Sequence, residues 1–250
     1  MRFDITRRAI VTSTMDVARA LAERGAPEGT VVLADAQTAG RGRAGHAWFS
    51  PPGQSLYLSV VLRPRIAPAQ AGWITMSAAL AVIDALEDLR DAVAAAPFSA
   101  AIKWFNDVLL NGRKVCGILV ESSITGDHFD YAALGIGLNV NTRFDDAPAE
   151  VQQRATSLWR ELGVALDREF ALEQLLRRIG ERQTDWTDGR HSPAGEYARR
   201  VETLGRQIEI ETGQGVICGR AIRIEDDGSL IVATDQGEVT ARFGDLARQV

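Results

Sequence analysis

The pair Asn111-Gly112 lies between two apolar segments and constrains the fold more than any other short stretch of the chain. Asn and Gly both tolerate positive φ, which the tightest turns between antiparallel strands require. A second turn follows at Gly126-Asp127. The strands predicted around these two turns cover residues 101–105, 108–110, 114–123 and 129–138. Strands joined by such short turns predict a mainly antiparallel sheet.

Helical segments accompany this sheet. After Ser13 or Thr14, either of which is a suitable N-cap, apolar residues recur at helical spacing. The predicted helices cover residues 15–23, about 69–90 and most of 156–200, with turns at Gly163 and Gly189. Two further strands are predicted over 30–36 and 55–62. Helices beside a mixed, mainly antiparallel sheet define an α+β fold class.

The pattern changes after Gly205, where short strands replace helices. Turn sequences such as Asp226-Asp227-Gly228 separate these strands. They are predicted over 207–212, 216–224, 230–233 and 238–241, with a turn at 213–215 between the first two. Short strands at this spacing predict a small β-barrel. We therefore expect two domains, residues 1–203 and residues 204–250.

Charge and hydropathy exclude several classes of protein. The chain has 28 Lys plus Arg against 33 Asp plus Glu, a formal charge of −5, whereas proteins that bind DNA phosphates usually show the opposite balance. The N-terminus lacks the apolar stretch of a signal peptide, and no stretch approaches the ~18 apolar residues that span a bilayer. We expect a cytoplasmic protein with no DNA or membrane partner. Cys116 and Cys218 stand in apolar segments and are expected to be small buried thiols.

The segment Gly40 to Gly45 (GRGRAG) matches the G-x-G-x-x-G fingerprint of dinucleotide-binding folds. That fingerprint requires a helix to begin within the glycines, and the downstream sequence HAWFSPPG cannot form one. The glycines let backbone N–H groups approach an anion, and Arg41 and Arg43 supply donors suited to phosphate or carboxylate. The segment therefore predicts an anion-binding loop. The alternative is a flexible surface loop with solvated arginines.

A second polar group surrounds the predicted hairpin. Lys103, Asn106 and Asp107 lie where one strand ends and the next begins, and Lys114 follows the Asn-Gly turn. Pairing across that turn would bring Lys114 back near Asp107. A cation, an amide and a carboxylate together suit a nucleotide site. The alternative is a solvated hairpin held by salt bridges.

Taken together, several motifs in order resemble those of biotin protein ligases, the biotin–[acetyl-CoA-carboxylase] ligase family, in the form without an N-terminal DNA-binding domain. The motifs are Ser13-Thr14, QTAGRGR with Gly45, Trp48, LYLS over 56–59, Lys103-Trp-x-Asn-Asp107, RKxxGIL over 113–119, and GIGLN over 135–139. Each is weak alone. Their order along most of the chain is specific.

The resemblance implies a class II synthetase-like catalytic domain over 1–203 and an SH3-like barrel over 204–250. It implies that biotin and ATP, assisted by Mg²⁺, form biotinyl-5′-AMP and pyrophosphate. The biotinyl group then passes to a lysine of the biotin carboxyl carrier domain of acetyl-CoA carboxylase or a related biotin-dependent carboxylase. Because only about a dozen residues precede Ser13, we expect no N-terminal DNA-binding domain. A monomer or homodimer is implied.

The resemblance also implies roles for individual residues. Arg43, Lys114, Lys103 and Asp107 are implied in catalysis. The residues implied in biotin binding are Ser13, Thr14, Met15, Gln37, Gly40, Arg41, Gly42, Arg43, Tyr57, Ser59, Lys114, Gly117, Leu119, Gly135 and Gly137. Those implied in nucleotide binding are Arg41, Arg43, Trp48, Lys103, Asn106 and Asn139. No residue is implied as a fixed metal ligand, because Mg²⁺ would be held through the phosphates.

Two positions depart from the family pattern. Met15 stands where the family usually has Asn, and Phe105 stands where it usually has Pro. Proline fixes φ, so the turn at Phe105 is expected to differ in shape. Three alternatives to the biotin ligase remain: a lipoate or octanoate ligase or transferase, a non-catalytic biotin-binding or regulatory protein, and a soluble α+β domain of another role. The first shares the catalytic fold, and the Gly-Arg loop with Lys103 to Asp107 favours biotin.

Overall fold

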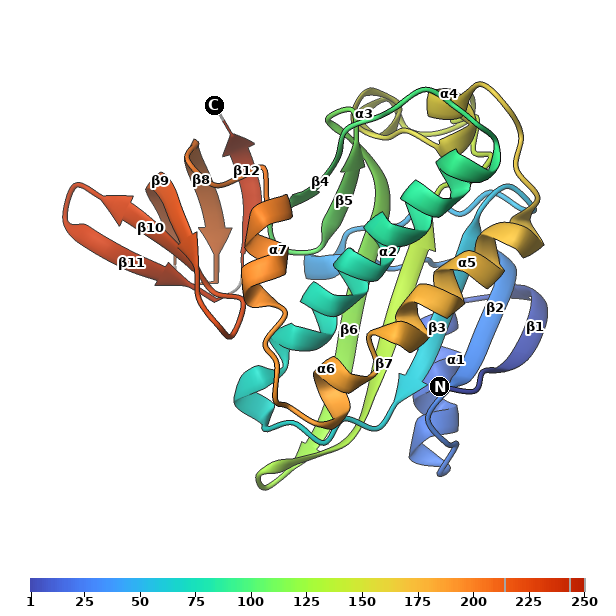
Figure 1. Ribbon diagram of the computed structural model, residues 1–250, viewed down its shortest axis with the longest axis horizontal. Helices are drawn as coiled ribbons and strands as arrows, with labels where there is room; N and C mark the ends of the chain where they lie inside the picture. The colour runs from blue at the N-terminus through green and yellow to red at the C-terminus, as the bar shows by residue number, and fades with distance from the viewer. Residues whose placement is uncertain (214, 243, 250) are drawn as a thin grey trace.

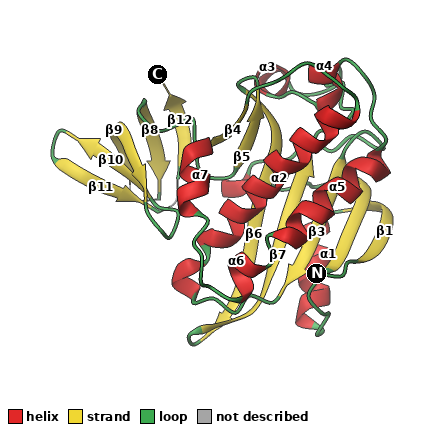
Figure 2. Ribbon diagram, viewed as in Figure 1, coloured by secondary structure: helices red, strands yellow, loops and turns green. Residues whose placement is uncertain are grey.

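The computed structural model describes residues 1–213, 215–242 and 244–249. Gln214, in the predicted turn at 213–215, lies outside the described residues, as do Phe243 and Val250 of the predicted C-terminal domain. The described chain forms two sheets, one of seven strands flanked by helices and one of five strands (Figures 1 and 2). The α+β class and the small C-terminal β unit predicted from the sequence are confirmed.

The larger sheet has the strand order β1-β2-β3-β7-β6-β5-β4. Its strands are β1 (Asp4–Val11), β2 (Thr30–Gln37), β3 (Leu56–Leu62), β4 (Ala100–Lys103), β5 (Asp107–Leu110), β6 (Arg113–Thr125) and β7 (His128–Leu138). Only β1 and β2 pair in parallel, and the other pairs in this sheet are antiparallel. Asn111 and Gly112 have φ of 49° and 76°, as the predicted hairpin turn requires. Strand β1 was not predicted, because this mostly exposed edge strand lacks an apolar repeat.

Helices cover both faces of this sheet. They are α1 (Thr14–Glu23), α2 (Gly72–Ala92), α3 (Ala149–Arg154), α4 (Leu158–Leu162), α5 (Arg168–Glu181), α6 (Thr184–Thr187) and α7 (Ala194–Arg200). Helix α1 packs on β2, β3 and β7 from one face, and α2 packs on the other (Figure 1). Ser13 is the N-cap of α1 and accepts a hydrogen bond from the Met15 N–H, as predicted.

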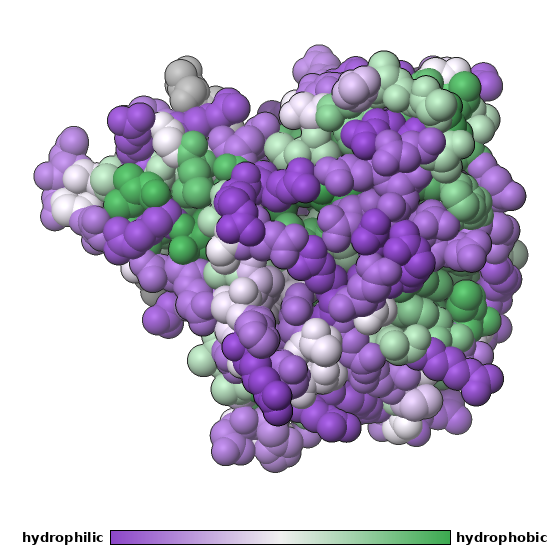
Figure 3. Space-filling model, in the orientation of Figure 1, coloured by the Kyte–Doolittle hydropathy of each residue, from purple (hydrophilic) through white to green (hydrophobic). Residues whose placement is uncertain are grey.

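Helix α2 is buried on nearly all sides, because the sheet lies on one side of it and α5, α6 and α7 lie on the other. The segment Pro68–Ala92 is long and apolar enough to cross a membrane by length and composition alone. The expectation that no stretch approaches this limit was therefore wrong. Most of this helix is buried inside the protein, and the surface of the helix layer is largely hydrophilic (Figure 3). Its composition is that of a core helix.

The C-terminal sheet has the order β11-β10-β9-β8-β12 and is antiparallel. Its strands are β8 (Gln207–Thr212), β9 (Gly215–Ile224), β10 (Leu230–Thr234), β11 (Gly237–Ala241) and β12 (Asp245–Gln249), the last of which was not predicted. Cys218 of β9 is exposed, so the expectation of a buried thiol is wrong there and correct for Cys116. Successive side chains of a strand point to opposite faces. Cys218 therefore faces outward, whereas its neighbours Ile217 and Gly219 lie on the more protected face.

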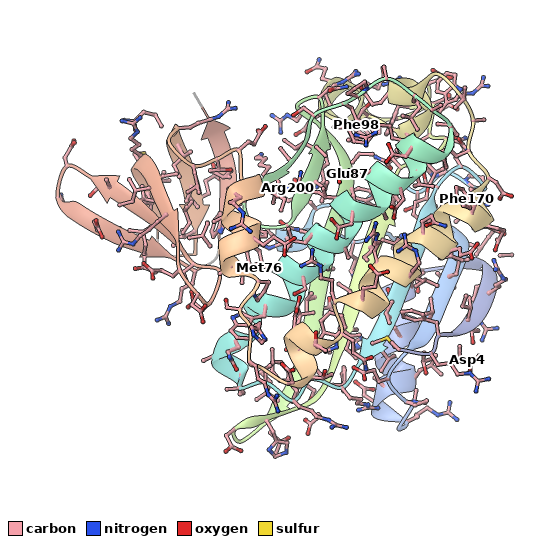
Figure 4. The ribbon with its side chains drawn as sticks, in the orientation of Figure 1. Asp4, Met76, Glu87, Phe98, Phe170 and Arg200 are labelled. Carbon is pink, nitrogen blue, oxygen red and sulfur yellow. The ribbon has the colours of Figure 1, made fainter. Side chains whose placement is uncertain are left out.

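Indole groups of the larger unit join the two sheets. The Trp73 side chain donates its N–H to the Asp226 carbonyl at 2.8 Å, and Trp104 donates to the Gly228 carbonyl at 3.0 Å. Nearby, the Arg200 guanidinium of α7 lies 3.2 Å from the Glu87 carboxylate of α2, and the two side chains point toward one another in Figure 4. The C-terminal sheet is thus attached beside the hairpin that begins at Lys103.

Candidate functional site

A cleft of about 600 Å³ opens between the larger sheet, the loop after β2 and the C-terminal sheet. Most of the residues proposed from the sequence line it: Ser13, Thr14, Met15, Gln37, Arg41, Gly42, Arg43, Trp48, Lys103, Asn106, Asp107, Lys114, Gly117, Leu119, Gly135 and Gly137. These residues come from segments more than 100 positions apart. Folding therefore brings together what the sequence shows only as separate motifs.

Glycines form the floor of the cleft. Gly117 of β6 pairs with Gly137 of β7, and Leu119 pairs with Gly135 two residues along. A Cβ atom at Gly137 would lie 2.5 Å from Trp48 Cε2, and one at Gly135 would lie 2.6 Å from Met15 Sδ. Both distances are too short for two carbon or sulfur atoms in van der Waals contact. The sheet needs glycine at these positions because side chains from α1 and from the loop lie directly on it.

The polar end of the cleft is a hydrogen-bond chain. The Thr14 N–H donates to Gln37 Oε1 at 2.9 Å, and the Thr14 hydroxyl lies 3.2 Å from the same oxygen. The Ser59 hydroxyl donates to Thr14 Oγ1 at 2.8 Å. The Gln37 amide donates in turn to Ser50 of the loop at 3.1 Å. Because these groups are held in place before a ligand binds, they suit the recognition of a small polar head group.

Lys114 and Asp107 meet at the middle of the cleft. Lys114 Nζ lies 2.6 Å from Asp107 Oδ1, so the predicted proximity across the Asn-Gly turn is confirmed. The Lys114 ammonium also lies 5.3 Å from the centre of the Trp48 ring, within cation–π range. Trp48 Nε1 is buried without a hydrogen-bond partner in the described structure. An unsatisfied buried donor beside a cation suits an anionic or carbonyl-bearing ligand.

The Gly-Arg loop contains no α-helix among its glycines, which confirms the rejection of a dinucleotide fold. A single 3-10 turn covers Arg43–Gly45, and Gly42 N–H donates to the His46 carbonyl at 2.7 Å. Arg41 lies 2.9 Å from Asp16 and 3.4 Å from Glu121, so ion pairs fasten this side chain to α1 and β6.

Arg43 has different surroundings. Its guanidinium carbon lies 5.2 Å from the centre of the Phe105 ring, and its Nη1 lies 3.4 Å from Asn106 Oδ1. Lys103, at the end of β4, directs its ammonium to the backbone carbonyl of Leu246 at 3.3 Å. The cationic side chains that line the cleft therefore include Arg43, Lys103 and Lys114.

Four of the proposed residues lie outside the lining of the cleft: Gly40, Tyr57, Ser59 and Asn139. Tyr57 is buried and donates its hydroxyl to the Pro51 carbonyl at 3.0 Å, and burial raises the pKa of this phenol. Asn139 is buried and donates to the Thr156 carbonyl at 3.1 Å. Tyr57 thus supports the loop from behind, Asn139 holds the connection before α4, and Ser59 reaches the cleft through its hydrogen bond to Thr14.

Several residues that line the cleft were not predicted from the sequence. They include Glu150, Gln153 and Arg154 of α3 and, from the C-terminal part of the chain, Glu202, Arg206 and Leu246. No motif marks them, because they come from a polar helix, from the connection after α7 and from β12, whose approach to the cleft depends on tertiary packing. Among the described residues, no group of three or more His, Cys, Asp or Glu side chains forms a metal site.

Comparisons with known proteins agree with this geometry. The sequence model of the biotin/lipoate A/B protein ligase family matches residues 8–139, more than half of the chain. The chain belongs to this family. A second model, the biotin protein ligase C terminal domain, matches residues 203–246.

Individual relatives extend the likeness over nearly the whole chain. The biotin–[acetyl-CoA-carboxylase] ligase of Mycobacterium tuberculosis is 38% identical over 223 residues, which cover 88% of this chain and 79% of the relative. The bifunctional ligase/repressor BirA of Bacillus spizizenii is 37% identical over 232 residues, covering 91% and 69%. The biotin protein ligase from Aquifex aeolicus, solved in complex with biotin and ATP, superposes with a TM-score of 0.80 at 30% identity and covers 99% of each chain.

Proposed function

We propose that this chain is a biotin–[biotin carboxyl carrier protein] ligase that activates biotin with ATP. The observation that carries the proposal is the glycine-floored cleft with the hydrogen-bonded pair Thr14 and Gln37 at one end and Lys114 at its middle. The polar head group of biotin would meet Thr14 and Gln37, its apolar tail would lie along the glycine floor, and its carboxylate would reach Lys114. The relatives of M. tuberculosis and A. aeolicus, named for biotin ligation, support the same assignment.

The reaction has two steps. A biotin carboxylate oxygen attacks the α-phosphorus of ATP, the bond to the β-phosphate oxygen breaks, and pyrophosphate leaves. The amine of an acceptor lysine then attacks the acyl carbon of biotinyl-5′-AMP, and AMP leaves with the electron pair of the C–O bond. The first step brings two anions together, so the site must neutralise negative charge.

The cations of the cleft meet this requirement. Lys114 would contact the biotin carboxylate and the α-phosphate, with Asp107 fixing the position of its ammonium. Arg43 would stabilise charge on the transferring phosphate, because a guanidinium offers planar donors to phosphate oxygens. Arg41, fastened by Asp16 and Glu121, would hold the closed loop. We assign the chemistry to Arg43 and the closure to Arg41.

The nucleotide would occupy the side of the cleft near the C-terminal sheet. Lys103 and Asn106 line this side, and Trp48 offers a flat apolar surface and an unpartnered N–H. The carboxylates near the cleft do not form a cage for a metal ion among the described residues. Mg²⁺ typically keeps phosphate and water ligands, so it would arrive with ATP and lessen the charge of the triphosphate. Asp107, which lines the cleft beside Lys114, would help to orient the hydrated ion.

The division of the chain follows the two sheets. We assign biotin and ATP binding to residues 1–203 and assign residues 204–250 to a C-terminal SH3-like β domain, which the second family match supports. The acceptor is the biotin carboxyl carrier domain of acetyl-CoA carboxylase or a related carboxylase. We propose that the reaction takes place in the cytoplasm, where ATP and a carboxylase acceptor would both be present.

Mass spectrometry of the acyl-adenylate tests the proposal. The protein is incubated with ATP, Mg²⁺ and either biotin or lipoate, and the products are weighed. We expect biotinyl-AMP with biotin and transfer to a carrier domain that retains its acceptor lysine, with no transfer to a Lys→Arg carrier. Formation of an adenylate with lipoate alone would instead identify the lipoate ligase that the broader family includes.

A further inference from the structure

Phe105 lies between the Gly-Arg loop and the C-terminal sheet, at a position where the resemblance led us to expect proline. The Arg43 guanidinium carbon is 5.2 Å from the centre of the Phe105 ring, and Arg43 Nη1 is 3.4 Å from Asn106 Oδ1. We propose that Phe105 is a positioning residue that seats Arg43 over the cleft and so retains biotinyl-AMP. This inference rests on the proposed function and adds to it a residue outside the expected machinery.

The two arginines of the loop differ in what balances their charge. Arg41 lies against the carboxylates of Asp16 and Glu121, which neutralise it. Arg43 lies against a ring face and an amide oxygen, both of them neutral. An aromatic face attracts a guanidinium through its quadrupole without cancelling the positive charge. Phe105 therefore orients Arg43 and leaves its charge available to a phosphate.

The ring of Phe105 is itself held firmly. The buried Tyr197 donates its hydroxyl to the Phe105 carbonyl at 2.6 Å. The Trp104 ring meets the Phe105 ring edge-on with centroids 5.8 Å apart, and Trp104 is anchored to the Gly228 carbonyl. Phe105 Cε2 also lies beside Gly228, 3.5 Å from the position that a Cβ atom on this glycine would occupy. The seat for Arg43 is thus fixed by the C-terminal sheet as well as by α7.

A proline at this position could not orient Arg43 in this way, because its ring has no π face for a guanidinium. The loop closes over a reactive anhydride, and a closed loop protects such an intermediate from water and from escape. Weaker seating of Arg43 would raise the fraction of open loop. The expected result is faster loss of the adenylate.

Two measurements test the role. In the first, the ligand-free protein is exchanged into deuterated water, and exchange is followed in the peptide covering 41–47, whose Gly42 and His46 amides are hydrogen-bonded in the loop turn. In the second, biotinyl-AMP is formed on the enzyme without acceptor, and its release is timed. We expect Phe105→Leu to speed both roughly fivefold, the effect of losing a partly desolvated cation–π contact.

Matched variants separate positioning from general damage. Phe105→Tyr keeps the ring and should restore both rates to within about twofold of wild type. Phe98, which lies beyond the end of α2, has its ring centre 5.3 Å from the guanidinium carbon of Arg90 (Figure 4). Phe98→Leu removes this similar contact and should change neither rate. Combined with Arg43→Ala, Phe105→Leu should add nothing, because the two residues act through one contact.

The possible outcomes distinguish failure of the Phe105 inference from failure of the proposed function. Unchanged exchange and release in Phe105→Leu, or a full additional effect on top of Arg43→Ala, would overturn the inference. A wild-type protein that forms no biotinyl-AMP would count against the proposed function instead. In that case faster exchange over 41–47 in Phe105→Leu, restored by Phe105→Tyr, would still support the seating of Arg43.

Discussion

Lys114 Nζ lies 2.6 Å from Asp107 Oδ1, although seven positions and a hairpin turn separate the two residues in the chain. Strand pairing explains the contact, since Leu109 is the partner of Lys114 and Gly117 is the partner of Asp107, with a register shift between them. The irregularity lets the lysine side chain lean along the glycine floor toward the carboxylate. A cation is thereby held where two anionic substrates would meet.

Replacing Lys114 should slow adenylation strongly. We expect Lys114→Ala to reduce biotin-dependent exchange of pyrophosphate into ATP about 100-fold, the usual cost of losing one preorganised charge at a reacting centre. Asp107→Asn should reduce it less, because the ammonium stays and only its orientation is lost. Exchange by Lys114→Ala at the wild-type rate would remove this residue from the mechanism.

A methyl group on the glycine floor should close the cleft. We expect Gly137→Ala to weaken biotin binding at least tenfold, because its Cβ would lie 2.5 Å from Trp48 and must displace that ring. Calorimetric titration with biotin measures the effect. Gly195→Ala in α7 is the matched control, since a Cβ there meets nothing within 4 Å. Equal affinities for the two variants would show that Trp48 moves away freely.

Glu161 should make stability depend on pH. Burial opposes ionisation of this carboxyl, which is 7% exposed, but the donors on Thr156, Asn111 and Arg113 outweigh it and hold the pKa of Glu161 below its usual value of 4.5. With the folded pKa lowered, the unfolded chain takes up the proton more readily. The stabilisation is therefore complete above about pH 4.5 and is lost as the pH falls through the folded pKa.

The variant Glu161→Gln should lower the free energy of unfolding by about 1–2 kcal/mol at pH 7, because it removes an ionised acceptor of several hydrogen bonds. Urea denaturation at a series of pH values measures this difference. The difference between wild type and variant should shrink below pH 4.5, where the Glu161 carboxylate of the wild type also loses its charge. Glu150→Gln, at a salt bridge with side chains 73% and 76% exposed, should change stability by well under 1 kcal/mol. A difference for Glu161→Gln that persists unchanged at low pH would contradict the assignment.

The chain should resist modification by its own product. Lys103 and Lys114 are its only lysines, and both line the cleft and contact other groups there. Biotinyl-AMP acylates lysine amines, so few sites are present for self-biotinylation. We expect little biotin on the protein after prolonged incubation with ATP and biotin. Arg206→Lys at the edge of the cleft should create a modified site, detectable by peptide mass, whereas Arg177→Lys on α5 should gain much less biotin. Similar labelling of both would indicate that the adenylate acts after diffusing away.

Residues that are close together in the sequence determined several turns, helices and motifs of this protein. The pair Asn111-Gly112 predicted the hairpin, and Ser13 predicted the start of α1. A tight turn and a helix cap both depend on residues next to one another in the chain. The Ala-rich sequence over about 69–90 predicted the long helix that the structure shows as α2. The glycines of the floor and the charges of the cleft were also visible as motifs. The edge strand β1 was not, because its exposure on both faces leaves no apolar repeat.

Only the tertiary structure decided how these parts meet. Trp48 lies on Gly137, Arg43 lies on Phe105, and Lys103 reaches the Leu246 carbonyl, in each case across more than 60 positions of sequence. Such contacts depend on the packing of whole strands and sheets, which no local propensity encodes. The sequence supplied two arginines of equal chemistry. Their different neighbours, carboxylates for Arg41 and a neutral ring for Arg43, follow from the fold alone.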